Sequence, residues 1–529
     1  MSNPADRIAR TIATEIAASA AQVTAAVGLL DEGATVPFVA RYRKEVTGGL
    51  DDTQLRTLAD RLTYLREMEA RRATILDTIK GQGKLTDDLA RAIAQADTKA
   101  TLEDIYLPYK PKRRTKAMIA RENGLEPLLR AIEENRAADP AKLAEGYTGE
   151  AVETVKAALE GARDILAEEL TENADLLGRL RDYMMREAVI TARVQPGKEE
   201  SGAKFSDYFD HRESWSKIPG HRALAILRAA KEEVVTIEIA PEGEEGATRA
   251  VGIVCTAIGI PGDGPGDQWL RAAAGWTWRV KLSLSMYVDL LTDLRRRAHE
   301  EAIAVFARNL KDLLLAAPAG NRPTLGLDPG IRTGVKAAVV DATGKLVETA
   351  TLYPFQPKND LRGAQAEIAR LVKRHGVELI AIGNGTASRE TERMVADTLK
   401  LLEGPKPTKV VVSEAGASVY SASELAAKEF PDLDVSLRGA VSIARRLQDP
   451  LAELVKITPE SIGVGQYQHD VDQRLLARAL EAVVEDAVNA VGVDLNMASA
   501  PLLAHVAGLG PSLAQNIVLH RDTHGAFPS

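Results

Sequence analysis

An aspartate in a glycine-rich turn is the first residue whose setting suggests chemistry. Residues 326–334 read Gly-Leu-Asp-Pro-Gly-Ile-Arg-Thr-Gly, and Asp328 ends a short run of strand-forming residues. Mg²⁺ prefers oxygen ligands and is commonly held by one or two carboxylates plus substrate phosphates. Two such ions stabilise the attacking and leaving oxygens of phosphodiester hydrolysis. The alternative is an ordinary Asp-Pro-Gly β-turn, in which Asp328 bonds only its own backbone.

Two further carboxylates are predicted to join Asp328. Glu414 follows a strand predicted over 409–413, and Asp449 follows a helix predicted over 437–447. The three residues form a candidate catalytic and metal-binding set for Mg²⁺ or Mn²⁺, while no cofactor is expected to be required. Asp449 has an equally good structural explanation, because Asp followed by Pro450 is typical of a helix N-cap with proline at the first helical position.

A glycine hairpin near the end of the sequence predicts contact with phosphate. Residues 502–518 read as two short helices joined by Gly-Leu-Gly, with Pro511 opening the second, which is typical of a helix-hairpin-helix module. Glycines let the backbone approach closely, and N–H groups at a helix start hold a phosphate without reading bases. The alternative, an ordinary αα-corner, needs only one glycine. The predicted nucleic-acid contacts are Gly508, Leu509, Gly510 and Ser512.

A basic loop follows Pro108 in this otherwise acidic chain, and no acidic residue interrupts it before Glu122. Such a local patch contacts backbone phosphates, whereas a solvated loop with helix-capping charges is the alternative. A smaller basic-aromatic cluster at 36–44 is predicted to be core packing with cations at its edge. The cations proposed as nucleic-acid contacts in the loop are Lys110, Lys112, Arg113, Arg114 and Lys116.

The element that positions the acidic residues is a predicted mixed sheet. Strand-like runs separated by turn residues occur at 324–328, 333–340, 346–353, 379–382 and 409–413. Amphipathic helices lie between the third and fourth runs and between the fourth and fifth. Three meandering strands followed by two right-handed helical crossovers give a five-stranded sheet with the order of the RNase H-like fold.

Elsewhere the hydrophobic periodicity is helical, so the predicted fold is multidomain and mainly α, with one α/β RNase H-like domain. The expected parts are a helical region over 1–230, an irregular segment and long linking helix over 231–321, the RNase H-like domain over 322–450, a helical connector over 451–498 and an incomplete helix-hairpin-helix over 499–529.

Composition limits the function classes. The 529 residues include 67 Lys and Arg against 75 Asp and Glu, a net charge of -8, so any polyanion-binding surface must be local. The single cysteine, Cys255, excludes an internal disulfide framework and fits a reducing compartment. No apolar run reaches the roughly 18 residues of a membrane span. We expect a cytoplasmic protein without a membrane partner, and we find no P-loop or zinc-protease motif.

Several longer segments together resemble the bacterial Tex family of transcription accessory proteins over essentially the whole chain. They are 36–44, 102–114, 217–223, 326–334 and 461–471. The resemblance implies a helical N-terminal region with a helix-turn-helix-like element, a YqgF-type RNase H-like domain, tandem helix-hairpin-helix modules and a C-terminal OB-fold RNA-binding domain. It also implies RNA or DNA as partners, together with RNA polymerase or a transcription complex.

The sequence departs from the family plan in two places. It stops inside the helix-hairpin-helix region, so we expect a fragment without the second hairpin and the OB-fold. Asp328, Glu414 and Asp449 match the three acidic positions of YqgF domains and of Holliday-junction resolvases. Resolvases carry another acid three residues after the last of these, where this sequence has Ala452, and Glu453 is one residue out of step.

These observations lead to two hypotheses of function. The favoured one is a transcription accessory protein that binds nucleic acid without sequence preference, through the hairpin and the basic patches. The alternative is a divalent-metal-dependent nuclease of the RNase H or resolvase type. The two differ in whether Asp328, Glu414 and Asp449 converge on one site.

Overall fold

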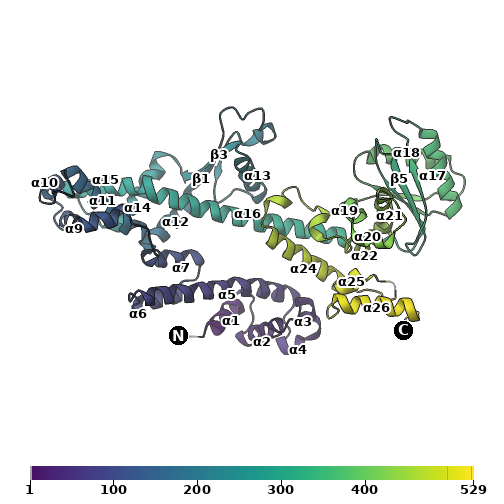
Figure 1. The fold of residues 1–529 in the computed structure, drawn as a ribbon, viewed down its shortest axis with the longest axis horizontal. Helices are drawn as coiled ribbons and strands as arrows, with labels where there is room; N and C mark the ends of the chain where they lie inside the picture. The colour runs from purple at the N-terminus through teal and green to yellow at the C-terminus, as the bar shows by residue number, and fades with distance from the viewer. Residues whose placement is uncertain (1–2, 497, 526, 529) are drawn as a thin grey trace. The chain divides into compact units, whose positions relative to one another are not determined.

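The chain divides into two compact units. The computed structural model describes residues 3–496, 498–525 and 527–528. One unit comprises Met1–Val23 and Thr57–His299, and the other comprises Thr24–Arg56 and Glu300–Ser529. Helices dominate both, and the strands form one three-stranded and one five-stranded sheet (Figure 1). This organisation confirms the predicted multidomain, mainly α fold.

Three helices contain the unit boundaries: α2 (Ala20–Asp31), α5 (Asp52–Gly81) and α16 (Ser283–Leu314). The other helices of the first unit are α1 (Pro4–Glu15), α6 (Asp87–Gln95), α7 (Lys99–Tyr106), α8 (Lys116–Glu122), α9 (Glu126–Glu134), α10 (Pro140–Glu145), α11 (Val155–Thr171), α12 (Ala174–Glu187), α13 (Gly220–Lys231), α14 (Gly243–Ile258) and α15 (Pro265–Thr277). Short 3-10 turns η1 (Leu107–Tyr109) and η2 (Ala203–Tyr208) and the π-helical turn η3 (Trp278–Leu282) complete it. Among the described residues no single helix is long and apolar enough to cross a membrane, although the bent pair α1 and α2 passes on length and composition.

A three-stranded antiparallel sheet interrupts the helices of this unit. Its order is β2-β1-β3, with β1 (Ala188–Val194), β2 (Asp210–Ser214) and β3 (Val235–Pro241). The region over 1–230, predicted to be helical, is therefore corrected, since it also contains the strands β1 and β2. The predicted irregular segment after residue 231 is corrected as well, since it contains β3, α14 and α15. The cause is local, because β1 follows α12 without a turn residue and β2 is a polar Asp-His-Arg-Glu-Ser run.

The second unit contains the hairpin helices and the larger sheet. Its helices, apart from those at the boundaries, are α3 (Val36–Tyr42), α4 (Lys44–Thr47), α17 (Leu361–His375), α18 (Ser388–Leu401), α19 (Ala417–Ser421), α20 (Glu424–Glu429), α21 (Val435–Gln448), α22 (Pro450–Leu454), α23 (Pro459–Ile462), α24 (Gln473–Val491), α25 (Ala500–Ala504) and α26 (Pro511–His524), with the 3-10 turn η4 (Gln468–Asp470).

The five strands of this unit form the predicted RNase H-like sheet. They are β4 (Thr324–Asp328), β5 (Val335–Val340), β6 (Leu346–Leu352), β7 (Leu379–Gly383) and β8 (Thr408–Val412), in the order β6-β5-β4-β7-β8. The first three meander in antiparallel pairs, and β4, β7 and β8 run parallel. Since parallel strands end at the same edge, the residues that follow β4 and β8 lie on one side of the domain.

Helices cover both faces of this sheet (Figure 1). The helices α17 and α18 bury Ile368, Leu371 and Met394 against one face. On the other face α21 lies so close to β4 that a Cβ on Gly326 would come within 2.9 Å of the Ala444 nitrogen. Only glycine fits at this crossing.

Candidate functional site

Two of the three predicted carboxylates come together at the carboxyl edge of the larger sheet. Asp328 is the last residue of β4, and Glu414 follows β8. Burial raises the pKa of Asp328 to about 6, the negative charge of Glu414 adds to the rise, and Lys336 opposes it. The structure therefore places Glu414 close enough to Asp328 for its charge to disfavour ionisation of Asp328.

The Glu414 side chain sits against glycine backbone. A Cβ on Gly383 or Gly385 would collide with its carboxylate, so the glycines at the end of β7 and in the loop after it leave room for this side chain. The Glu414 N–H donates to Asn384 Oδ1 at 3.1 Å, which fixes the start of the segment. The carboxylate oxygen Oε2 is buried and accepts no hydrogen bond among the described residues.

Asp449 does not join this pair. It lies at the far end of α21, ten residues after Gly439, which is about 15 Å along a helix axis. Gly439 is the residue that faces Asp328, because a Cβ there would come within 2.7 Å of Asp328 Oδ2. The Asp449 side chain accepts from the Ala452 N–H at 3.1 Å and caps α22.

The neighbours of Asp449 confirm its position at the opposite edge of the sheet. Gln448 donates to the carbonyl oxygens of Arg322 at 2.9 Å and Asp341 at 2.8 Å, which precede β4 and follow β5. Glu453 is buried and paired with Lys456 at 2.9 Å. In the part of the chain that the structure describes, no group of three acidic, histidine or cysteine side chains is arranged to hold a metal ion. The residues present therefore do not fit a two-metal site.

The predicted hairpin is present between α25 and α26. Pro511 is the first residue of α26, and Gly510 precedes it in an extended conformation without a capping side chain. Gly508 has a φ of 87°, a left-handed conformation that favours glycine. The first N–H groups of α26 thus keep their capacity to bind an anion. Gly508, Gly510 and Ser512 are exposed, and Leu509 is half-buried.

Asn489 in α24 anchors the hairpin, and sequence reasoning missed it. Its amide donates to the His505 carbonyl at 2.9 Å, and its Oδ1 accepts from the Ala507 N–H at 2.8 Å. Its own carbonyl accepts from the Arg41 guanidinium at 2.6 Å. The only sequence signal was an asparagine on the apolar face of an amphipathic helix. Burial lowers the pKa of His505, which disfavours a positive charge on this side chain.

The basic-aromatic cluster at 36–44 lies beside the hairpin. Val36, Pro37 and Val39 are buried in α3, which agrees with the predicted core packing. The Phe38 ring lies next to Gly508, where a Cβ would be 3.7 Å from it. Four exposed residues come next in the chain, and we call them the basic-aromatic edge: Arg41, Tyr42, Arg43 and Lys44.

Aromatic contacts hold the basic-aromatic edge in place. The Arg43 guanidinium lies over the Phe38 ring at 5.3 Å, and the Phe38 and Tyr42 rings are 5.4 Å apart. Tyr42 keeps 47% of its surface exposed. Arg56, in α5, pairs with Glu485 at 3.0 Å and Asp486 at 2.7 Å, both in α24. The hairpin and the basic-aromatic edge are therefore two parts of one surface of the second unit.

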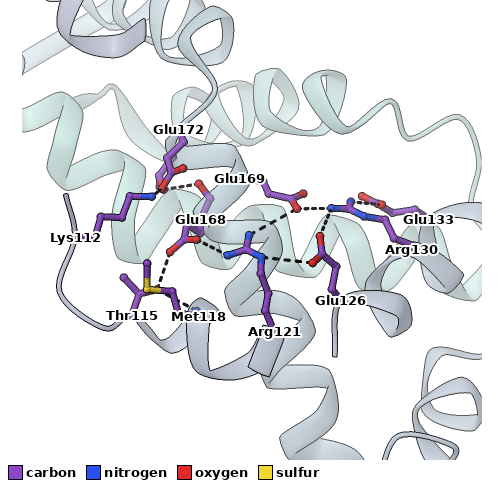
Figure 2. Close-up of polar contacts among 11 residues, drawn as sticks. Lys112, Thr115, Met118, Arg121, Glu126, Arg130, Glu133, Glu168, Glu169 and Glu172 are labelled. Atoms are coloured by element: carbon purple, nitrogen blue, oxygen red, sulfur yellow. Dashed lines mark hydrogen bonds and ion pairs between the residues drawn. The ribbon is translucent and has the colours of Figure 1, made fainter. Parts of the chain in front are cut away.

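The predicted basic loop belongs to the first unit and is charge-balanced in part (Figure 2). Lys112 pairs with Glu172, and Arg114 pairs with Glu122. Thr115 caps α8 and donates from Oγ1 to Glu168 at 2.8 Å. The other three predicted contacts are exposed and form no ion pair with the described residues; they are Lys110, Arg113 and Lys116.

Glutamates surround the cations beyond this loop. Arg121 donates to Glu168 at 2.6 Å, and Arg130 pairs with Glu133 at 2.7 Å and with Glu169 (Figure 2). An acidic face of α11 therefore neutralises much of the basic sequence that precedes it. The loop offers three cations to a polyanion instead of the five counted from the sequence.

Comparison with known proteins assigns these parts to one family. Residues 6–80 match the Tex-like protein N-terminal domain, 135–306 the Tex central region-like domain, 322–448 the Tex protein YqgF-like domain and 488–529 the helix-hairpin-helix motif. The chain is 57% identical to the transcriptional accessory protein Tex of Neisseria gonorrhoeae, over 99% of this chain and 69% of that protein. It is 58% identical to the protein tex of Bordetella pertussis, over 99% of this chain and 68% of that protein. Similarity extends to the human S1 RNA-binding domain-containing protein 1, at 35% identity over 94% of this chain and 51% of that protein. The chain belongs to the Tex family.

Proposed function

We propose that this protein binds nucleic acid as a transcription accessory factor and holds the phosphate backbone without reading bases. The observation that carries the proposal is the uncapped start of α26 at the hairpin, with the basic-aromatic edge beside it. Backbone N–H groups and exposed guanidinium and ammonium groups are the usual partners of phosphate oxygens. The names of the Neisseria and human relatives, which refer to transcription and to RNA binding, support the same function.

The test is a binding titration on the whole chain. We expect fluorescence anisotropy with labelled single-stranded and duplex oligonucleotides to give similar affinities for unrelated sequences. Arg43→Glu together with Lys44→Glu should weaken duplex binding at least tenfold and reduce its salt dependence, because each lost phosphate contact on a duplex lowers the log–log slope by about 0.9.

A matched control variant tests whether weaker binding depends on these two positions or only on net charge. Arg362→Glu with Lys406→Glu changes the net charge equally at exposed positions of the RNase H-like domain. We expect this variant to bind like the wild type. Equal affinities of the wild type and the Arg43 and Lys44 double variant would remove the basic-aromatic edge from the proposed surface.

We further propose that the RNase H-like domain is a scaffold for structure or partner contact and does not cleave phosphodiester bonds. The separation of Asp449 from Asp328, and the glycine that faces Asp328 from α21, support this proposal. Cleavage of RNA, duplex DNA and branched DNA, each with Mg²⁺ or Mn²⁺, should be the same background for the wild type and for Asp328→Asn. A metal-dependent activity that Asp328→Asn abolishes would reinstate the nuclease alternative. A helix-turn-helix-like element, RNA polymerase as partner and a cytoplasmic location stay predictions.

A further inference from the structure

A hollow between α11 and α15 in the first unit combines aromatic and cationic side chains. It has a volume of about 590 Å³. Two of the four tryptophans of the chain line it, Trp269 and Trp276, and both are half-buried. Lys156, Arg163 and Arg279 supply three positive charges, against one negative charge from Glu160. In a chain with a net charge of -8 this is a locally positive, aromatic site.

Helical spacing explains why these side chains meet. Trp269 and Trp276 are seven residues apart and lie on one face of α15, with Ala272 and Ala273 as a flat floor between them. The π-helical turn η3 follows at once and carries Arg279, whose guanidinium passes over Gly275 of α15. Turns of this kind are frequent at functional sites.

Arg163 is arranged as a stacking platform. Its guanidinium lies over the Trp276 ring at 3.9 Å, which is the geometry of a cation–π contact. The guanidinium has only a long contact to Asp164 at 3.4 Å, and its Nε is buried without a hydrogen-bond partner among the described residues. A planar cation stacked on an aromatic ring binds phosphate and also stacks with bases.

We propose that this hollow, which we call the tryptophan pocket, binds an unpaired nucleotide of single-stranded nucleic acid. Trp269 and the Arg163–Trp276 stack offer flat surfaces to the base, and Lys156 and Arg279 lie exposed at positions suited to the flanking phosphates. A duplex keeps its bases stacked inside, so the pocket discriminates against it. The inference deepens the proposed nucleic-acid binding but rests on different residues in a different unit.

The experiment measures tryptophan fluorescence of the whole chain during titration with a 12-nucleotide oligouridylate at low salt. We expect saturable quenching of the wild type. Lys156→Glu with Arg279→Glu should weaken binding of the oligonucleotide at least tenfold and change duplex binding less than twofold. Lys84→Glu with Lys231→Glu makes the same charge change at exposed positions elsewhere in this unit and should bind like the wild type.

A second pair of variants separates stacking from folding. Trp269→Leu should weaken oligouridylate binding about 5- to 160-fold, the range for loss of one stacked base, whereas Trp269→Phe should restore most of the affinity. Arg43→Glu with Lys44→Glu should leave the quenching in place, so the hairpin proposal and the pocket proposal fail separately. No saturable quenching of the wild type, or wild-type affinity of the Lys156 and Arg279 double variant, would overturn the pocket proposal. Quenching by poly-glutamate but not by oligouridylate would overturn it in favour of an acidic peptide.

Discussion

Replacement of Asp328 by asparagine should stabilise the RNase H-like domain at neutral pH. Asp328 is half-buried beside Glu414, and partial burial together with the Glu414 charge raises the pKa of its carboxyl to about 6 from an ordinary value of 3.8. The charged form is therefore less stable in the folded protein than in water. Asparagine keeps nearly the same shape and carries no charge, so the variant avoids this cost.

The direction and the size of the stabilisation expected for Asp328→Asn follow from proton linkage. Between pH 3.8 and 6 the folded protein binds more protons at Asp328 than the unfolded chain does, so its free energy of unfolding falls as the pH rises. The change amounts to about 1.36 kcal/mol for each pH unit between the two pKa values, so the total loss of free energy of unfolding is about 3 kcal/mol. About 1 kcal/mol of it is already present at pH 4.5, because the unfolded carboxyl is largely ionised there. The advantage of Asp328→Asn should therefore grow by about 2 kcal/mol between pH 4.5 and pH 7.5.

Hydrogen exchange measured by mass spectrometry gives the comparison for this domain alone. Peptides covering β4 and β7 are compared between the wild type and Asp328→Asn at each pH, so that intrinsic exchange rates cancel. Asp432→Asn, at an exposed aspartate of the same domain, is the control for the loss of one carboxylate. A destabilised Asp328→Asn variant at pH 7.5, or a difference that does not change with pH, would refute the reasoning.

Two further predictions concern the hydrogen bond that holds the hairpin and the close packing of α21 on β4. Asn489→Ala leaves the partly buried His505 carbonyl without its donor, and should cost about 1 to 3 kcal/mol of hairpin stability and weaken duplex binding in an anisotropy titration. Gly326→Ala should cost about 1 to 3 kcal/mol in urea denaturation, because its Cβ would collide with α21. Gly178→Ala, in α12 with no heavy atom within 4 Å of the new Cβ, should instead stabilise by about 0.5 to 1 kcal/mol. Equal effects of the two glycine replacements would contradict the packing argument.

The strands of the larger sheet were predictable because each is a short apolar or β-branched run between turn residues. The sequence therefore predicted β4 at its observed bounds and the ends of the other four strands within two residues. The smaller sheet lacked these signals. The central strand β1 buries two alanines and one isoleucine, so its alternation of apolar and polar residues was weak. It also begins directly at the end of α12, without a turn residue between them. Its edge partner β2 is polar throughout and is held by pairing with β1.

The sequence did not predict how Asp449 lies relative to Asp328 and Glu414. Asp328 and Glu414 lie together because one ends and the other follows parallel strands of the same sheet, and this order of strands is readable from the sequence. Asp449 depended on the direction of α21, which runs antiparallel to β4, and no local pattern encodes that direction. Its first turns lie at Asp328 and its last residue lies beside Arg322, at the start of β4. Tertiary packing alone decides which end of this helix meets the acidic pair.

The proposed nucleic-acid surface of the second unit depends on two segments that lie far apart in the sequence. A motif search finds the hairpin, but the hairpin is held by Asn489, and Asn489 is held in turn by Arg41. The ion pairs of Arg56 with α24 join the same two segments a second time. A fragment of residues 473–529 would keep Asn489 and the uncapped start of α26, but it would lose the cations of the basic-aromatic edge and the contacts of Arg41 and Arg56 with α24. Binding by such a fragment therefore underestimates binding by the whole chain, and the difference measures the contribution of the basic-aromatic edge.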